Sequence, residues 1–453
     1  MKPDPLSAMA VRRLKSCFNG EIITPRSRDY RAASRVWNRA VKKNPAIIAQ
    51  CMSRDDVLRS IEFARRNDLV ISLRSGGHSF GGFGVCDNGI VVDVSRMRRT
   101  QIAPESAMVT VEPGIRGGEL DCITQAFKMA VPLGSCPAVG VAGYALGGGE
   151  GSLTPRFGYA CDNIVNVEMV SADGRLLTAN NEENRDLFWA LCGAGANFGV
   201  AISLSFKMHP VDQVLSGHLK YPIRQAAKVL AFVEQYAHSV PEGMYMIIAV
   251  LPHPGERMLD IGVLWPGATA AGIKALRPLR TFLKPLEDSI DVHSYLDEQR
   301  SGSDSPGEGD YFSQRRSGHL AKLTPSGIEA VIDHISNSPS EASGITMIYW
   351  HGRWSSKPRP NAFGFRRTGY EYWIHSYWRR PTQRRRSENW VQQFYSSLAP
   401  LSTGAVYVNG LEDEGAERTH AAYGDKYKRL QSIKLKYDPD NVFRINQNIQ
   451  PAV

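Results

Sequence analysis

Three glycine-rich segments constrain the fold of this chain more than any other feature of its sequence. They occupy residues 74–82, 140–151 and 193–199, and the second contains three consecutive glycines at 147–149. Glycine tolerates positive φ and has no side chain, so its backbone N–H groups can approach a bound phosphate closely. One such segment is most often an ordinary turn, but three that converge could hold a pyrophosphate.

The common nucleotide-binding motifs do not account for these glycines. A Rossmann GxGxxG follows a strand and opens a helix. Residues 193–199 instead follow a predicted helix and precede a predicted strand, and their glycine spacing differs by one residue. No Walker GxxxxGK[S/T] occurs in the chain. Nicotinamide or ATP binding through those two folds is therefore disfavoured.

The amino-acid composition narrows the classes of protein to which this chain can belong. With 453 residues, 42% hydrophobic and 22% charged, we expect a globular protein of two or three domains. No apolar run is long enough to span a membrane, and no signal-peptide core is seen, so a cytoplasmic protein is expected. The chain has 54 Lys and Arg residues against 45 Asp and Glu residues. Its one dense basic run, residues 379–386, is typical of a solvated surface, so nucleic-acid binding is disfavoured. The seven cysteines include no CxxC pair and no HExxH occurs, so no metal is expected.

The pattern of the chain changes twice. Residues 1–210 alternate between short apolar strands and helices, whereas residues 211–400 show alternating segments typical of antiparallel strands with helices between them. The latter stretch is expected to form a separate α+β domain. Residues 401–453 contain a predicted short strand at 405–409, then a helix and a polar terminal segment.

Two reactive side chains border the glycine segments. His78 follows the first glycine pair, and Cys136 precedes the second segment. Imidazole and thiolate are nucleophiles, so the two could tether an electrophilic cofactor. Either could equally be packed or hydrogen-bonded, and their spacing in the sequence does not show that they meet.

The sequence resembles the FAD-linked oxidases of the vanillyl-alcohol oxidase superfamily and, within it, the berberine-bridge-enzyme-like branch. The matching segments follow the family's order and lie at residues 74–78, 136–143, 147–151, 158–164, 186–190, 193–200 and 441–449. The resemblance implies an α+β fold with a PCMH-type FAD-binding domain formed by both chain ends, residues 1–210 and 401–453. A substrate domain with an antiparallel sheet, residues 211–400, is inserted between them.

The resemblance also implies how FAD is held. In this branch a histidine at the position of His78 bonds to the flavin 8α-methyl and a cysteine at the position of Cys136 bonds to flavin C6, so bicovalent FAD is expected. Main-chain amides near the first segment are expected at the pyrophosphate, the second segment under the isoalloxazine, and the third near the adenine. The further expected cofactor contacts are Arg74, Ser75, Gly76, Gly77, Ser79, Val139, Gly140, Gly143, Gly148, Asn163, Gly195, Asn197, Gly199, Val200, Asn409, Asn446 and Asn448. For Asn163 a structural turn is the alternative, and for Asn446 and Asn448 a role in locking the tail.

A flavin oxidation also needs a base within hydrogen-bond reach of the proton that leaves the substrate. Tyr407, on the predicted late strand, is the first candidate, with a core tyrosine as the alternative. Tyr349 and His351 are further candidates, because a period of two places them on one side of a strand that is expected to face the flavin. Many relatives carry tyrosine where this chain has Glu150. An ionised carboxylate cannot donate a hydrogen bond, so Glu150 favours a cationic substrate or a different base.

The expected function is that of an FAD-dependent oxidase. It would remove a hydride from an alcohol or amine carbon of a sugar or secondary-metabolite-like small molecule. The small side chain of Val139 leaves room for O2 in this branch, so reoxidation to hydrogen peroxide is expected. The alternatives are a dehydrogenase of the same fold that uses another acceptor, and a nucleotide- or nucleic-acid-binding protein without a redox role.

Overall fold

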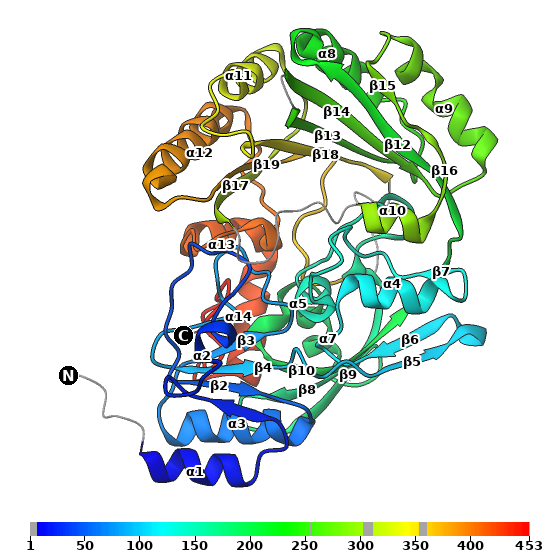
Figure 1. Cartoon of the computed structure of the whole chain (residues 1–453). Coiled ribbons are helices and arrows are strands. Elements are labelled where there is room, and N and C mark those ends of the chain that lie inside the picture. Colours follow the sequence, from blue (N-terminus) through cyan, green and yellow to red (C-terminus); the bar gives the residue numbers. More distant parts are fainter. Residues whose placement is uncertain (1–6, 254–255, 302–310, 353–359, 453) are drawn as a thin grey trace.

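The computed structural model describes residues 7–253, 256–301, 311–352 and 360–452. Helices and sheets are mixed, in two parts stacked one above the other (Figure 1). The lower part contains two larger sheets, a two-stranded sheet and the first and last described residues of the chain, and the upper part is built on one large antiparallel sheet. The expected α+β fold class is confirmed.

The first sheet of the lower part has four strands in the order β1-β2-β4-β3. Their bounds are β1 (Glu21–Ile23), β2 (Ile47–Gln50), β3 (Ile71–Arg74) and β4 (Ile90–Asp93), and β4 lies parallel to both β2 and β3. Helix α1 (Ala8–Ser16) and helix α3 (Arg54–Arg66) pack against it. The sequence of α3 favours a helix there, because the Ser53 hydroxyl accepts from the N–H of Asp56 at its start and Val57 and Ile61 form a fully buried face.

The second sheet is antiparallel, with five strands in the order β5-β6-β10-β8-β9. Its strands are β5 (Thr100–Ala103), β6 (Met108–Val111), β8 (Ile164–Ser171), β9 (Leu176–Asn180) and β10 (Gly199–Lys207). Between them the chain forms α4 (Gly117–Gln125), α5 (Val141–Leu146), α6 (Thr154–Phe157) and α7 (Arg185–Ala194). The second and third glycine-rich segments therefore adjoin α5 and α7.

The large sheet of the upper part has eight strands, and all of its recorded pairings are antiparallel, as expected. They are β12 (Gln213–Pro222), β13 (Tyr245–His253), β14 (Glu256–Trp265), β15 (Glu287–Asp288), β16 (Asp291–Ser294), β17 (Phe312–Leu320), β18 (Gly344–Trp350) and β19 (Gly369–Trp378). Helices α8 (Ala226–Ala237), α9 (Thr269–Thr281), α11 (Pro325–Ser336) and α12 (Arg384–Leu398) lie along its outer side (Figure 1). The inner side faces the lower part, so both faces of the sheet are covered.

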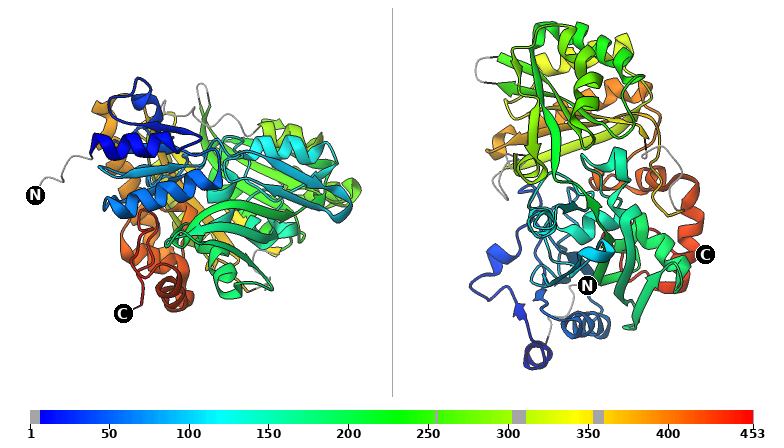
Figure 2. Two further views of the ribbon diagram at one scale, coloured as in Figure 1. Left: turned by 90° about the horizontal axis from the view of Figure 1, so that it is seen from below. Right: turned by 90° about the vertical axis from the view of Figure 1, so that its right-hand side faces the viewer.

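The end of the chain returns to the lower part. Helices α13 (Ala416–Tyr423) and α14 (Tyr427–Tyr437) are followed by an extended tail, and α14 packs against α7 (Figure 2). The short strand predicted over residues 405–409 does not form, because that segment is a loop ending in a 3-10 turn at Val408–Gly410. The division into residues 1–210, 211–400 and 401–453 remains a proposal, which is compatible with β12 beginning at Gln213 and α12 ending at Leu398.

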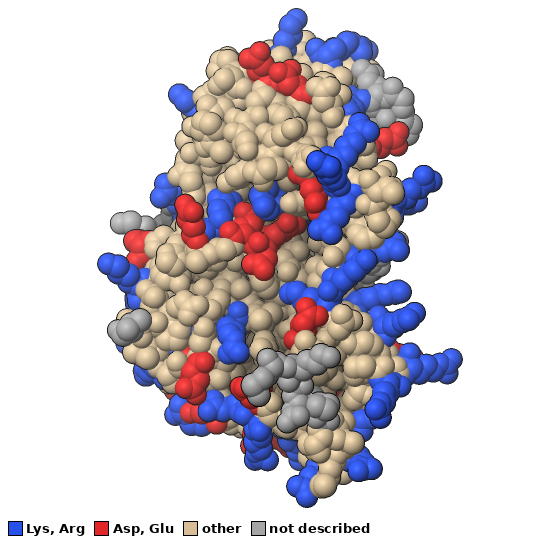
Figure 3. Space-filling model, turned by 90° about the vertical axis from the view of Figure 1, so that its left-hand side faces the viewer, with Lys and Arg blue, Asp and Glu red and all other residues tan. Residues whose placement is uncertain are grey.

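Basic side chains are spread over the surface and form no single strip on the face shown in Figure 3. On that face Lys and Arg occur on both parts, most densely along one edge, and Asp and Glu gather near the middle (Figure 3). Within the basic run, Arg384 forms an ion pair with Glu388 at 2.6 Å, and the Arg384 side chain is 64% exposed. All residues of the run are exposed, and its last three begin α12. No helix among the described residues is long and apolar enough to cross a membrane.

Candidate active site

The first two glycine-rich segments touch through their backbones. A Cβ added to Gly76 would lie 2.3 Å from the nitrogen of Gly140, and one added to Gly140 would lie 2.3 Å from the Ser75 hydroxyl oxygen. Backbones can approach this closely only where both residues lack a side chain. The contact brings the loop that carries His78 against the loop that follows Cys136.

The third glycine-rich segment is bound to the C-terminal tail. Asn197 donates from its amide nitrogen to the carbonyl of Gln447 at 3.2 Å, and its amide oxygen accepts from the N–H of Ile449 at 2.9 Å. Asn446 donates to the carbonyl of Ala196 at 2.8 Å. The side chain of Asn197 is therefore committed to fixing the tail, which differs from its expected direct contact with a cofactor.

Its neighbours in that segment also serve packing. A Cβ on Gly195 would lie 2.6 Å from the side chain of Leu146, and one on Gly199 would lie 2.1 Å from that of Met169. Val200 is buried in the core beneath the first sheet. The close contacts at Gly195 and Gly199 explain why the third segment has glycine at these two positions. Any cofactor contact in this segment stays a prediction for its main-chain atoms.

His78 and Cys136 lie on the first and second loops, and neither is enclosed in the core. Both side chains are partly exposed, His78 lies beside the ring of Trp37 at 6.1 Å, and Cys136 is in no disulfide. At exposed Gly143 on α5, an added Cβ would meet no atom within 4 Å. Ser75, Gly77 and Ser79 of the first loop are also partly exposed, as is Val139 of the second.

The tail adds acceptors without partners. The amide oxygens of Asn446 and Asn448 are buried and have no hydrogen-bond partner among the described residues. Amide oxygens of this kind suit the ring N–H of a flavin. Together with the open space at Gly143 and the backbone contact at Gly140, these residues fit the dinucleotide that the resemblance implies.

Two expected cofactor contacts are instead committed within the protein. The guanidinium of Arg74 is buried, forms an ion pair with Asp93 at 2.7 Å and donates to the carbonyl of Ala33 at 2.6 Å. The amide of Asn163 donates to the carbonyl of Tyr159 at 2.8 Å, and its oxygen lies 2.7 Å from His209 Nε2. We therefore assign both side chains a structural role.

Tyr407 lies against the glycines at 147–149. Its hydroxyl oxygen accepts from the N–H of Gly149 at 2.8 Å and from the side-chain amide of Asn409 at 2.8 Å. Asn409 also donates to the carbonyl of Tyr144 at 3.0 Å, and a Cβ on Gly148 would lie 3.0 Å from the Tyr407 ring. The absence of a side chain at Gly148 thus makes room for Tyr407, and two donors converge on the hydroxyl oxygen.

The expectation that Tyr349 and His351 face the glycine segments is wrong. As predicted, they lie on one side of β18, and their rings stack with centroids 5.1 Å apart. That side is the outer one, because Tyr349 packs in the core formed with α8, α11 and α12, and His351 lies 2.6 Å from the carbonyl of Met244 through Nε2. The inner side of β18 instead carries Ile348 and Trp350, which pack in the core shared with Tyr407.

Glu150 is buried and has a partner that the sequence analysis missed. The side chain of Glu371, on the inner side of β19, lies beside it, and the pKa of Glu150 is raised to about 7 by burial. Glu371 is the only acidic residue of the ten in β19, and an isolated acid in a buried strand is the signal that could have identified it.

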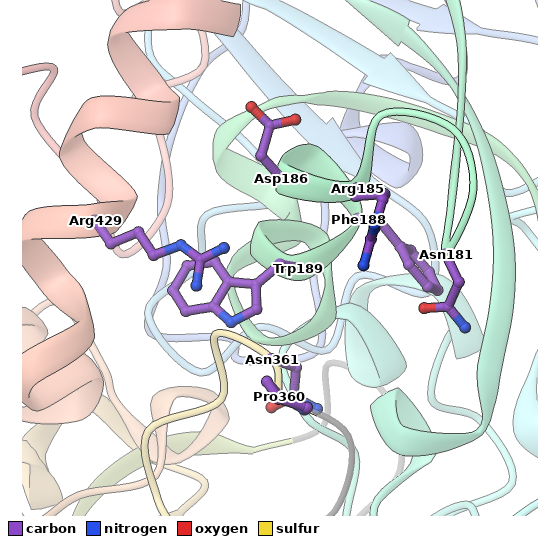
Figure 4. A pocket seen from close by; sticks show the side chains of 8 residues that line it. All are labelled: Asn181, Arg185, Asp186, Phe188, Trp189, Pro360, Asn361 and Arg429. Carbon is purple, nitrogen blue, oxygen red and sulfur yellow. The ribbon is translucent and has the colours of Figure 1, made fainter.

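A surface pocket lies away from these residues. It has a volume of about 440 Å³ and is lined by α7, α14 and residues 360–361 (Figure 4). The guanidinium of Arg429 lies over the ring of Trp189, 3.9 Å from its centroid. None of the predicted site residues lines this pocket. Among the described residues, no cluster of His, Cys, Asp and Glu could hold a metal ion.

Comparison with known proteins agrees with this geometry. Residues 45–180 match the family described as FAD binding domain, and residues 406–450 match the family described as berberine and berberine like. The chain is 31% identical to the FAD-linked oxidoreductase pgmH of Aspergillus terreus, over 98% of this chain and 96% of that protein. It is 28% identical to (R)-6-hydroxynicotine oxidase of Paenarthrobacter nicotinovorans, over 96% and 97% of the two chains.

Solved structures show the same fold over nearly the whole chain. The structure of 6-hydroxy-D-nicotine oxidase from Arthrobacter nicotinovorans superposes with a TM-score of 0.90 at 25% identity and covers 96% of this chain and 98% of that one. Carbohydrate oxidase from Microdochium nivale, in complex with a substrate analogue, superposes with a TM-score of 0.86 at 24% identity and covers 98% and 100% of the two chains.

Proposed function

Since this chain belongs to the berberine-bridge-enzyme-like family of FAD-linked oxidoreductases, we propose that it oxidises an alcohol or amine carbon of a small molecule and passes the electrons to O2. The substrate class is a sugar or a compound resembling a secondary metabolite, and the product of O2 reduction is hydrogen peroxide. Named relatives include a hydroxynicotine oxidase and a xylooligosaccharide oxidase, so amines and sugar hydroxyls are the two substrate groups to test first.

The observation that carries this proposal is the backbone contact between Gly76 and Gly140. It brings the loops of His78 and Cys136 together beside the open space at Gly143. A cofactor lying over Gly143 could be reached by both nucleophiles, which supports bicovalent attachment of FAD through His78 and Cys136. Asn446 and Asn448 offer acceptors to the same cofactor from the tail.

Tyr407 is the proposed base. FAD, when bound, supplies the acceptor for a hydride from the substrate carbon. Tyr407 receives the proton that leaves the substrate oxygen or nitrogen as it gives up its own hydroxyl proton to the protein, and its oxygen is held by the N–H of Gly149 and the amide of Asn409. Burial, followed by the nearby groups Tyr144, Glu150 and Glu371, raises the pKa of Tyr407 well above its usual value, and the N–H of Gly149 opposes this rise. Asn409 acts by orienting this oxygen.

Acid denaturation of the purified protein tests the cofactor proposal directly. We expect flavin absorbance to stay with the polypeptide and peptide mass analysis to find flavin on His78 and Cys136. His78→Ala and Cys136→Ala should each retain one bond, and the double variant should release all flavin. Cys122→Ala, which removes an exposed cysteine on nearby α4, is the matched control and should behave as the wild type.

The same preparation separates the functional alternatives. Release of all flavin from the wild-type chain by acid would refute bicovalent attachment, and a colourless protein would refute the flavoenzyme. Anaerobic reduction by a substrate, followed by rapid reoxidation in air with hydrogen peroxide release, is the result expected for an oxidase. Slow reoxidation would instead indicate a dehydrogenase that uses another acceptor.

A further inference from the structure

Two buried carboxyl groups meet beside Tyr407. Glu150 follows the second glycine-rich segment, and Glu371 lies 221 residues later on β19. Along β19 the neighbours Tyr370 and Tyr372 pack into the outer core, so Glu371 projects from the inner side toward Glu150. Only 7% of Glu150 and 1% of Glu371 is exposed.

The surroundings of the two glutamates contain no obvious counter-charge. Neither forms an ion pair with a Lys or Arg that the structure describes. Glu150 Oε2 and both carboxyl oxygens of Glu371 have no hydrogen bond of normal length there, although the indole N–H groups of Trp350 and Trp373 lie near Glu371. The groups that influence or adjoin the pair come from several elements: they are Tyr144, Tyr159, Tyr245, Tyr407, Trp350, Trp373 and His319.

The charged groups nearby do not neutralise the pair. His319 is opposite Glu371 on β17, and burial lowers its pKa to about 4, so this imidazole is neutral near pH 7. Arg366 reaches the ring of Tyr159, but its guanidinium is held by Asp162 at 2.6 Å. The negative charge of the two carboxyl groups must therefore be reduced within the pair itself.

One proton shared by Glu150 and Glu371 would remove the repulsion between their carboxyl groups. Two adjacent ionised carboxylates in a buried site repel each other and leave their oxygens without donors, whereas one proton removes a charge and supplies a donor. Burial, and then the charge of Glu150, raise the pKa of Glu371 well above its usual range. The indole N–H groups of Trp373 and Trp350 oppose this rise. Glu371 therefore holds the proton, and Glu150 is the member that titrates near neutral pH.

We propose that Glu150 and Glu371 form a proton-sharing carboxyl pair that acts as a positioning device for the proton of Tyr407. This inference rests on the proposed oxidase function. The substrate O–H or N–H bond breaks, and its proton passes to the Tyr407 oxygen. The proton that Tyr407 already carries passes to Glu150, and the pair changes from one proton to two. With FAD bound, the cofactor would accept the electron pair of the substrate C–H bond as a hydride, and the proton held by the pair would be returned when O2 is reduced to hydrogen peroxide.

The carboxyl pair lies next to Tyr407 inside the molecule. Glu371 and Tyr407 are each 1% exposed, and the Tyr407 oxygen is linked to the partly exposed side chain of Asn409. Tyr407 is linked to the second glycine-rich segment by the N–H of Gly149, the residue before Glu150.

Infrared spectroscopy tests the shared proton without requiring activity. At pH 8 the wild-type holoenzyme should show a protonated-carboxyl C=O band that shifts in D2O, and Glu371→Gln should remove it. The matched control is Asp121→Asn, another buried carboxyl, whose loss should leave the band at pH 8 unchanged. A band that persists undiminished in Glu371→Gln would overturn the proposal.

Isotope labelling covers the case in which Glu371→Gln does not fold. Wild-type protein labelled with [13C]glutamate should shift the pH 8 band, because the proton resides on a glutamate. If the band does not shift, the proposal is wrong whatever the behaviour of the variants.

Kinetics then test the positioning role. In single-turnover reduction of the bound flavin, Glu150→Gln should remove the ionisation near neutral pH and lower the rate at pH 8 by about tenfold or more. Glu150→Asp should restore the ionisation, and Asp121→Asn should keep it. An unchanged pH profile in Glu150→Gln would refute the role in proton transfer. A wild-type protein without flavin would instead refute the proposed function. The infrared measurement would still test the shared proton of the carboxyl pair independently.

Discussion

Replacing Lys434 by methionine tests how the tail that carries Asn446 and Asn448 is held. The ammonium of Lys434 donates to Asp438 at 2.6 Å and to the carbonyl of Asn197 at 2.6 Å. Both side chains of the ion pair are 0% exposed. Methionine keeps most of the volume of lysine and removes the charge, so Lys434→Met isolates the contribution of the ammonium.

The remaining contacts of the pair set the expected magnitude. Lys434 also donates to the carbonyl of Phe443 at 3.0 Å, and Asp438 accepts from the N–H groups of Val442 and Phe443 at 2.8 and 2.9 Å. Removing one partner of a buried pair leaves the other charge uncompensated and costs about 3–5 kcal/mol. With an unfolding entropy of about 2.1 cal/mol/K per residue, this corresponds to a fall of about 3–5 °C in Tm if the chain unfolds as a unit.

Lys436→Met is the matched control on the same helix. Lys436 pairs with Asp186 at 2.7 Å, but its side chain is 59% exposed. An exposed pair of this kind contributes at most about 1 kcal/mol. The two variants lose the same charge from α14 two residues apart, so the difference in Tm between them measures the effect of burial.

Thermal unfolding and hydrogen exchange provide the two measurements. The N–H groups of Val442 and Phe443, which Asp438 binds, should exchange about 100-fold faster in Lys434→Met, because about 3 kcal/mol corresponds to two decades. Flavin content should fall in the same variant if the tail contributes to cofactor binding. Equal Tm values for Lys434→Met and Lys436→Met would refute the reasoning, as would unchanged exchange of the tail.

Four further predictions follow from contacts elsewhere in the structure. Gly143→Ala should keep or raise the stability of the flavin-free chain, since its Cβ meets no atom within 4 Å and alanine favours helix by about 1 kcal/mol, yet it should lower flavin incorporation. Gly140→Ala should lower both the stability of the flavin-free chain and its flavin incorporation, because the new Cβ would lie 2.3 Å from the Ser75 hydroxyl oxygen. Equal melting temperatures for Gly140→Ala and the wild type would contradict this. Tyr407→Phe should slow flavin reduction about 100-fold or more with little change in flavin content, as measured by rapid mixing. Burial raises the pKa of Asp121 to about 7, so its contribution to stability is complete below the unfolded value near about 4 and is lost as pH rises through 7. Asp121→Asn should therefore gain Tm relative to the wild type between pH 5 and pH 8, and a constant difference would exclude this linkage.

Local sequence signals were sufficient for the family, the fold class and the cofactor. The three glycine-rich segments and the final polar tail lie in the same order as in the relatives, and residues 45–180 and 406–450 match the two families. Such segments are recognisable because close backbone approach, as at Gly76 and Gly140, permits only glycine. The individual contacts to the cofactor stay predictions.

Local sequence patterns could not predict orientations that depend on packing between distant parts of the chain. A period of two correctly placed Tyr349 and His351 on one side of β18, but both sides of that strand are buried, so no polar face marked which one pointed inward. For Arg74 and Asn163, the sequence does not reveal whether a polar group contacts a ligand or the protein. The structure shows their side chains bound to the buried Asp93 and to the carbonyl of Tyr159, and a cofactor contact at either residue stays a prediction.

By itself, the sequence determined the FAD-binding family of this chain and predicted His78 and Cys136 as residues at the edges of its flavin site, because short glycine-rich segments carry the family pattern. Only the tertiary structure decided that Glu150 would have a second carboxyl beside it. Glu371 comes from a strand of the other part of the molecule, 221 residues away. A shared proton depends on two groups being brought together out of water, and that proximity exists only after the two parts have packed.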